Sequence, residues 1–305
     1  MCCGRRTAGW RWLCDPRFAY LYKDVVSEQE KDTAPILIAE LFPEVRRELL
    51  QVLEGLSPEE WERQTAAPLW SVKDVALHLL GGDVSNLSRR RDAFRLPGKA
   101  ITEYRELVEF INSWNAQWIA AARRMSPRVL CDLLALTGPQ LAEYFASLDP
   151  FVMGKPVSWA GPDPAPVWLD IAREYTEQWH HQQQIRDATG RPPLYASRLF
   201  APVLDTFLRA TPHVYRDVAA PEGTAVKIQI TGDAGGTWFL ARTPRGWKLL
   251  LACDTEPAAS IAIAQEVAWR LFTKGLRGDE ARRLTVVDGD LDLCEPFFRT
   301  VAVIA

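Results

Sequence analysis

The chain has 305 residues, of which 48% are hydrophobic and 25% are charged, so its composition is globular and excludes an intrinsically disordered chain. The formal net charge of -3 gives no electrostatic reason to expect a nucleic acid as partner. Every apolar run is shorter than the roughly 20 residues that cross a bilayer, so we do not expect a membrane partner either.

The cysteines and the first residues indicate the compartment. Six cysteines are scattered along the chain without a CxxC pair, which disfavours both a disulfide framework and a cysteine-based zinc site. Residues 1–14 are basic but lack the apolar centre of a secretory signal. We therefore expect a cytoplasmic protein.

The chain divides into three parts by its pattern. Residues 1–33 show no clear period and are predicted to be an N-terminal extension. Residues 34–218 have apolar positions at helical spacing, and residues 219–305 change to a period of two. The predicted fold is mainly α: a helical bundle followed by a small α+β domain.

Helix starts in the middle part have clear signals. Ser57 and Ser71 are each followed three residues later by an acid, and Pro58 occupies a first helical position. Gly138-Pro139 is expected to interrupt a helix, and Gly190 to end one. The predicted helices span residues 35–53, a short segment from 57, 71–94, 103–124, 126–134, 139–148, 167–189 and 198–214.

The last part reads as a meander with flanking helices. Two turns rich in glycine and proline, 233–236 and 243–246, separate three strand-like runs. The predicted strands span residues 225–231, 237–242, 247–253, 258–263 and 284–287, and the predicted helices span 265–276 and 291–304.

Three side chains on two of these helices form a candidate metal site. Glu177 and His181 are four residues apart, so both can reach one ion from the same side of their helix. His78 lies on the edge of the apolar stripe of helix 71–94, and Gly82 one turn later leaves space above the imidazole. If the two helices are neighbours in a bundle, His78 faces the other two. Two histidines and one carboxylate leave coordination positions open for water or a substrate.

Two other readings of these residues remain open. Glu177 and His181 at this spacing also form ordinary i,i+4 pairs, and a lone histidine on a helix is commonly structural. His180 is expected to point toward the polar side of its helix, and His213 to be a surface or capping residue. We therefore prefer His181 to His180 as the ligand.

Two stretches carry a resemblance to a known family. Residues Trp70 to Leu79 (WSVKDVALHL) and Arg173 to Arg186 (REYTEQWHHQQQIR) resemble the two ligand helices of the mycothiol-dependent maleylpyruvate isomerase family. That family belongs to the DinB-like four-helix-bundle metalloproteins. The resemblance covers roughly residues 36–215, and a looser likeness relates the last part to a sterol-carrier-like domain.

The resemblance implies a fold, a metal and a co-substrate. It assigns His78, Glu177 and His181 as ligands of one divalent metal, expected to be Zn²⁺, in a bacterial protein that uses a thiol such as mycothiol. Many members have Asp three residues after the last histidine, whereas this chain has Gln184. An acid there could act as a base, while a glutamine can only orient, so the difference bears on which reaction is catalysed.

Two functions are compatible with these features. The first is a metal-dependent thiol transferase or isomerase, acting on a small-molecule thiol and an electrophile, with Gln184 as a candidate catalytic residue. Asn115, Trp118 and Arg90 are candidates to line its pocket, although a core role for Trp118 and a solvated one for Arg90 are open. The alternative is a non-catalytic metal-binding module, whose last domain binds an apolar ligand or a partner through residues that include Trp238, Phe239, Trp247 and Leu249.

Overall fold

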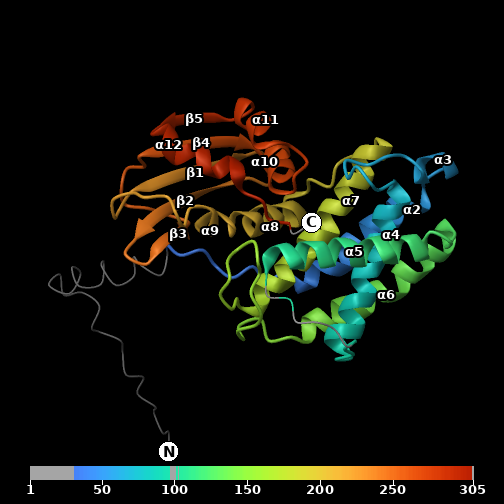
Figure 1. Ribbon diagram of the computed structural model, residues 1–305. Coiled ribbons are helices and arrows are strands. Elements are labelled where there is room, and N and C mark those ends of the chain that lie inside the picture. The colour runs from blue at the N-terminus through green and yellow to red at the C-terminus, as the bar shows by residue number, and fades with distance from the viewer. Residues whose placement is uncertain (1–30, 97–100, 102, 304–305) are drawn as a thin grey trace, which may run out of the picture.

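The computed structural model describes residues 31–96, 101 and 103–303 and consists of a helical bundle and an α+β part (Figure 1). The predicted extension 1–33 therefore lies almost entirely outside the described residues. Within the described ranges, no helix combines the length and apolarity that a membrane crossing requires.

Four helices pack against one another in the bundle. The helices of this part are η1 (Ala39–Leu41), α2 (Phe42–Glu54), α3 (Pro58–Trp61), α4 (Val72–Asn86), the π-helix η2 (Leu87–Arg91), α5 (Tyr104–Ala122), α6 (Pro127–Ser147) and α7 (Val167–Thr189). The four are α2, α4, α6 and α7: both α2 and α4 pack against α6 and against α7. Helix α5 lies against α4 on the outside.

The sequence signals for helix starts and ends are found where expected. Ser57 and Ser71 each form a capping box, with Glu60 and Asp74 respectively. Gly190 ends α7 in the left-handed conformation at φ 66°, which a glycine adopts without steric cost.

One expectation about the bundle is wrong. The predicted break at Gly138-Pro139 is absent, and α6 continues through both residues to Ser147. The proline loses one backbone hydrogen bond, but packing of α6 against α2 and α4 holds the helix together. Gly138 is needed there for another reason, because a Cβ atom would lie 2.8 Å from Cγ of Arg46.

The last part of the chain is a five-stranded sheet with helices. The strand order is β3-β2-β1-β4-β5, in which only the β1–β4 pair is parallel. The elements are α8 (Ser197–Leu208), α9 (Thr211–Val214), β1 (Ala225–Thr231), β2 (Gly236–Thr243), β3 (Gly246–Leu250), β4 (Ala259–Ala264), α10 (Gln265–Phe272), α11 (Gly278–Arg283), β5 (Val286–Gly289), α12 (Leu291–Cys294) and η3 (Glu295–Arg299).

The helices of this part are shorter than predicted. The expected helix 198–214 is divided into α8 and α9, and Pro212 lies in the first turn of α9. The expected helix 291–304 is only α12 and the 3-10 turn η3, with Pro296 near the start of the turn. A proline fits the first turn of a helix, where its missing N–H would have no intrahelical partner, so each of these residues favours a new start.

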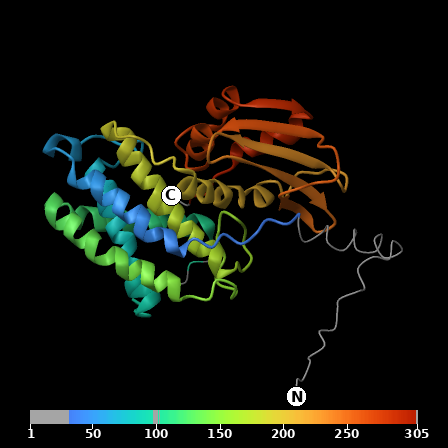
Figure 2. The ribbon, with the colours of Figure 1, turned by 180° about the vertical axis from the view of Figure 1, so that it is seen from behind.

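The bundle and the sheet share a hydrophobic core that includes side chains of α7 and α8. Figure 2 shows these two helices, in yellow and gold, where the two parts meet. Trp179 of α7 stacks on Phe200 of α8 at 4.3 Å between ring centroids and meets Trp269 of α10 edge-on at 5.7 Å. Trp238, Trp247 and Leu249, candidates for an apolar ligand pocket, are buried in this core. A division of the chain at 218/219 stays a prediction. One side of α7 is therefore held in the shared core, and its other side packs against α4.

Candidate metal centre

The first candidate ligand is set by the start of α4. Ser71 accepts a hydrogen bond from the backbone N–H of Asp74, whose carboxylate accepts one from the N–H of Ser71. This box fixes the first turn, and His78 comes two turns into the helix. Gly82 follows one turn later, and a Cβ atom there would have no heavy atom within 4 Å, so the expected space beside His78 is present.

The other two candidates lie on α7, a helix that is buried on nearly all sides. It packs against α2, α4 and α8, so it has no continuous solvent-exposed face. Glu177 and His181 are one turn apart and face α4. Their side chains are 29% and 9% exposed, and that of His78 is 18% exposed, so solvent reaches the group.

The three side chains converge on one point. Their ligand atoms all lie within 4.8 Å of one another. Nε2 of His181 is 3.3 Å from Oε2 of Glu177, and Nε2 of His78 is 4.0 Å from the same oxygen. The packing of α4 against α7 therefore brings together residues that are about a hundred positions apart in the chain.

Gln184 determines which nitrogen of His181 faces the carboxylate. Nδ1 of His181 lies 2.9 Å from Oε1 of Gln184. An amide oxygen can only accept, so Nδ1 is the donor of this hydrogen bond. Nε2 is then the nitrogen that faces Glu177. Gln184 thus contacts a candidate ligand rather than standing free in a pocket, and any catalytic role for it stays a prediction.

The charge states of the group suit a cation. Burial lowers the pKa of His78 more than its acidic neighbours raise it, so this imidazole is neutral at pH 7. Burial alone would raise the pKa of Glu177, but His181 and His78 outweigh it and hold that pKa well below the usual range. The group therefore offers an ionised carboxylate and, at His78, a neutral imidazole, both of which are ligand types of a divalent ion.

The donor types of the group also suit a metal ion. Imidazole nitrogens and a carboxylate oxygen, gathered here within 4.8 Å of one another, are ligands that a divalent ion such as Zn²⁺ binds. The residues present therefore fit a metal ion, and its binding stays a prediction.

A paired charge cluster continues from the site along the same two helices. Asn86 donates to Glu174 at 2.9 Å, and Arg90 forms ion pairs with Asp170 at 2.6 Å and Glu174 at 3.3 Å. Arg173 also pairs with both acids. Because its guanidinium is already paired with two carboxylates, Arg90 is less available to a thiol or substrate than a free surface arginine, and the predicted binding role stays untested.

The other two pocket candidates are on α5. Asn115 is half-buried, and its proposed contact with a thiol stays a prediction. Trp118, one turn later, donates from Nε1 to the carbonyl of Leu77 at 2.8 Å and packs against the bundle core. Gly81 permits this approach, since a Cβ atom there would lie 2.7 Å from the indole ring.

His180 does not point toward a polar side, as the sequence suggested. It is 4% exposed, and its Nδ1 lies 2.9 Å from the carbonyl of Thr176. Burial, with repulsion from His181 as the next cause, lowers its pKa to about 3. The expectation failed because it assumed that one side of α7 faces solvent, whereas every residue from Gln178 to Arg186 is buried. His213 is half-buried at the end of α9.

Two features near the site were not anticipated from the sequence. The ring of Trp70 lies against both candidate imidazoles, at 4.8 Å from His78 and 6.1 Å from His181 between centroids. Arg46 and Asp83 form a buried ion pair in the bundle core, 2.8 Å long. The sequence did contain a signal for this ion pair. Asp83 lies three residues after Leu80 on the apolar stripe of α4, and an acid at such a position predicts a buried partner.

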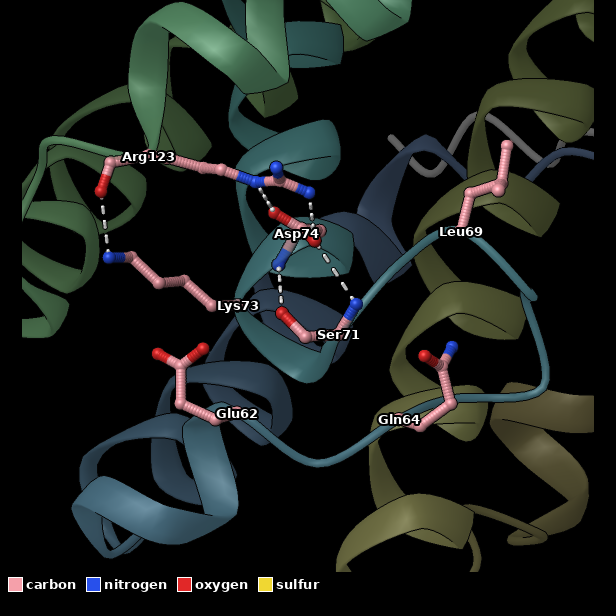
Figure 3. A pocket seen from close by; sticks show the side chains of 7 residues that line it. All are labelled: Glu62, Gln64, Leu69, Ser71, Lys73, Asp74 and Arg123. Carbon is pink, nitrogen blue, oxygen red and sulfur yellow. Dashed lines mark hydrogen bonds and ion pairs between the residues drawn. The ribbon is translucent and has the colours of Figure 1, made fainter.

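A surface pocket of about 470 Å³ lies beside the start of α4 but not at the candidate metal centre (Figure 3). Figure 3 shows Arg123 directed at the carboxylate of Asp74, with two hydrogen bonds of 2.8 Å, and Lys73 directed at the carbonyl of Arg123. Because these charged groups are occupied with one another, the pocket offers no set of free groups for a ligand. It is lined by Glu62, Gln64, Leu69, Ser71, Lys73, Asp74 and Arg123.

A comparison with known protein families gives a match that includes α4 and nearly all of α7, the two helices of the candidate site. Residues 42–186, which include all three candidate ligands, match the family described as the mycothiol maleylpyruvate isomerase N-terminal domain. No curated protein sequence matches the chain.

Three solved structures are similar to this one at low sequence identity. A mycothiol-dependent maleylpyruvate isomerase is 10% identical, with 76% of this chain and 86% of that chain covered at a TM-score of 0.46. A histidine-to-alanine mutant described by the same name is 11% identical, with coverage of 83% and 92% and a TM-score of 0.45. A UbiJ-SCP2 ubiquinone synthesis protein is 15% identical, with coverage of 36% and 95% and a TM-score of 0.24. Over residues 42–186, the helical part of this chain is thus similar to the mycothiol maleylpyruvate isomerase N-terminal domain.

Proposed function

We propose that the chain is a metal-dependent enzyme that uses a low-molecular-weight thiol, such as mycothiol, to isomerise or to modify a small electrophile. The observation that carries the proposal is the convergence of the ligand atoms of His78, Glu177 and His181 within 4.8 Å. The match of residues 42–186 to the mycothiol maleylpyruvate isomerase N-terminal domain supports the choice of thiol.

In this proposal the three side chains hold one divalent ion, which we expect to be Zn²⁺. Bound there, the ion would lower the pKa of a thiol and so supply a nucleophile at neutral pH. Three protein ligands are the usual number in catalytic zinc sites, in which a further position is left to water or substrate.

The residues of the chain would contribute orientation and space. Gln184 holds His181 with Nε2 directed at the centre, because its amide oxygen accepts a hydrogen bond from Nδ1. Gly82 leaves open space on the His78 face of α4, where a side chain would otherwise stand. Glu177 supplies the one negative charge of the donor set, and its depressed pKa keeps it ionised at the pH of the cell.

A first experiment tests the ligands. Purified wild-type protein is expected to hold about one equivalent of divalent metal, and His78→Ala to hold far less at the same free-metal concentration, both by elemental analysis. His213→Ala is the matched control, since His213 lies on α9 and outside the group. Equal metal in the wild type and His78→Ala would remove the site.

A second experiment separates an enzyme from a non-catalytic metal module. Metal-loaded protein is incubated with mycothiol and maleylpyruvate, and isomerisation is followed with each component omitted in turn. The enzyme is expected to show a rate that requires both metal and thiol and that His78→Ala lacks. A protein that binds metal and shows no thiol-dependent rate, with this or other electrophiles, would favour the module.

A further inference from the structure

The indole ring of Trp70 lies against both histidines of the candidate metal centre, although Trp70 is outside the two ligand helices. The ring planes of Trp70 and His78 are tilted by 33° at 4.8 Å between centroids, and those of Trp70 and His181 by 45° at 6.1 Å. The two imidazoles are themselves 4.6 Å apart and nearly perpendicular, at 72°. The three rings therefore form one aromatic cluster.

The backbone of Trp70 is unusually well fixed for a loop. Its carbonyl accepts three hydrogen bonds: from the N–H of Thr65 at 3.2 Å, from the hydroxyl of Thr65 at 2.8 Å and from the amide of Gln64 at 2.9 Å. Its N–H donates to the carbonyl of Ala67 at 3.0 Å. The loop that carries the ring is thus tied at several points, and the next residue, Ser71, begins α4.

The two candidate histidine ligands differ in what orients them. His181 has the hydrogen bond from Nδ1 to Gln184. Among the described residues, no hydrogen bond from Nδ1 of His78 is found, although a ligand histidine usually has such a partner. The torsion that turns an imidazole about its Cβ–Cγ bond is broad, so a ring without a partner samples several orientations. Besides the other ligand candidate, His181, the ring that lies against His78 is that of Trp70.

We infer that Trp70 is a positioning residue for the metal centre, whose indole ring fixes the plane of the His78 imidazole by stacking in place of a hydrogen bond. The inference rests on the proposed metal site and assigns Trp70 no contact with the metal. It also explains why Trp70 is tied through its carbonyl: a ring can orient another only if its own backbone is held.

The expected effect follows from the size of aromatic contacts. An aromatic pair contributes enough beyond its buried area to change an equilibrium roughly 2- to 12-fold. We therefore expect Trp70→Ala to raise the Kd for Co²⁺ by about tenfold and to change the visible absorption of bound Co²⁺, which reports ligand geometry. Trp70→Phe keeps an aromatic face and is expected to retain near wild-type affinity and spectrum.

Leu69→Ala is the matched control. Leu69 is the neighbour of Trp70 in the same loop, and at 85% exposed it makes no contribution to the aromatic cluster. It is expected to leave both the Kd and the spectrum unchanged. Thermal unfolding of each variant without metal shows whether the loop change has disturbed the bundle.

The outcomes separate the inference from the proposed function. If the wild type does not bind Co²⁺, the metal site and the inference both fail. If the wild type binds and Trp70→Ala binds with the same Kd and spectrum, only the inference fails. If Trp70→Phe is as weak as Trp70→Ala, stacking is not what Trp70 supplies, and the inference is overturned. Weak binding by Trp70→Ala with rescue by Trp70→Phe supports it.

Discussion

Two polar clusters lie between the same helices, α4 and α7, and they differ in how completely their groups are satisfied. One contains His78, Glu177 and His181, in which the carboxylate is 3.3 Å and 4.0 Å from the two imidazole nitrogens and solvent has access. The other joins Asp83 of α4 and Gln178 of α7 to Arg46 of α2 and Thr137 of α6.

The second cluster contains one side chain from each of the four packed helices, α2, α4, α6 and α7. Asp83 is fully buried and accepts hydrogen bonds on both oxygens, from Arg46 at 2.8 Å and from Thr137 at 2.6 Å. Arg46 also donates to Gln178 at 2.9 Å and to the carbonyl of Leu134 at 3.2 Å, and only its Nε lacks a partner. Neighbouring residues of α4 and α7 thus have two roles. The cluster whose hydrogen-bonding groups are nearly all paired fixes how the helices pack, and the one with unpaired groups remains able to bind a metal ion.

The largest effect is expected at the satisfied cluster. Asp83→Ala leaves the Arg46 guanidinium buried without its carboxylate, which costs about 3–5 kcal/mol of unfolding free energy. The measurement is urea unfolding of both proteins followed by circular dichroism. The double variant Arg46→Met, Asp83→Leu removes both charges and is expected to recover most of the loss. A cost below about 1 kcal/mol for Asp83→Ala would show that the ion pair does not hold the bundle.

A smaller effect, and one confined to ligand binding, is expected at the unsatisfied cluster. Gln184→Ala removes the acceptor for Nδ1 of His181 and should weaken metal binding roughly 10- to 100-fold, as loss of such partners does elsewhere. Competition with a chromophoric chelator measures the affinity. Gln184→Glu keeps an acceptor oxygen and serves as the control, with affinity at or above that of the wild type. If Gln184→Ala lowered stability without metal as much as it lowered affinity, the two clusters would not differ in the way described.

The smallest effect is expected at the start of α4, away from both clusters. Burial alone would raise the pKa of Asp74, but the hydrogen bonds from Arg123 and Ser71 outweigh it and the pKa is lowered. Arg123 is 58% exposed, so Arg123→Ala should cost roughly 0.2–1 kcal/mol at pH 7. Because a depressed carboxyl pKa stabilises the folded state only above the unfolded value of about 3.9, this difference should persist down to about pH 5 and shrink below pH 4.

Urea unfolding of the wild type and Arg123→Ala at pH 7, 5 and 3.5 checks this sign. Lys73→Ala is the comparison variant, since Lys73 contacts only the carbonyl of Arg123 and leaves the Asp74 carboxylate paired. A difference between wild type and Arg123→Ala that grows as the pH falls would contradict the assignment.

Much of the architecture was predictable because its signals are local. Each of these signals lies within a few residues of the helix or strand boundary that it marks. They are the capping serines at 57 and 71, the glycine at 190 and the change of period after residue 221. The mainly α fold with a following α+β part was confirmed on this basis. The break at Pro139 was wrong because the local cost of a helix proline was outweighed by packing against α2 and α4, which no short window contains.

The sequence by itself determined which residues could serve as ligands, because the i,i+4 spacing of Glu177 and His181 and the position of His78 on α4 follow from helix geometry alone. Only the tertiary structure decided that these residues meet, that His180 is buried, that Trp70 lies against His78 and that Asp83 has Arg46 as its partner. The reason is physical. Spacing along a helix fixes the side on which a residue lies, but what stands opposite depends on how separate segments pack, and that is set by burial of apolar surface across the whole chain.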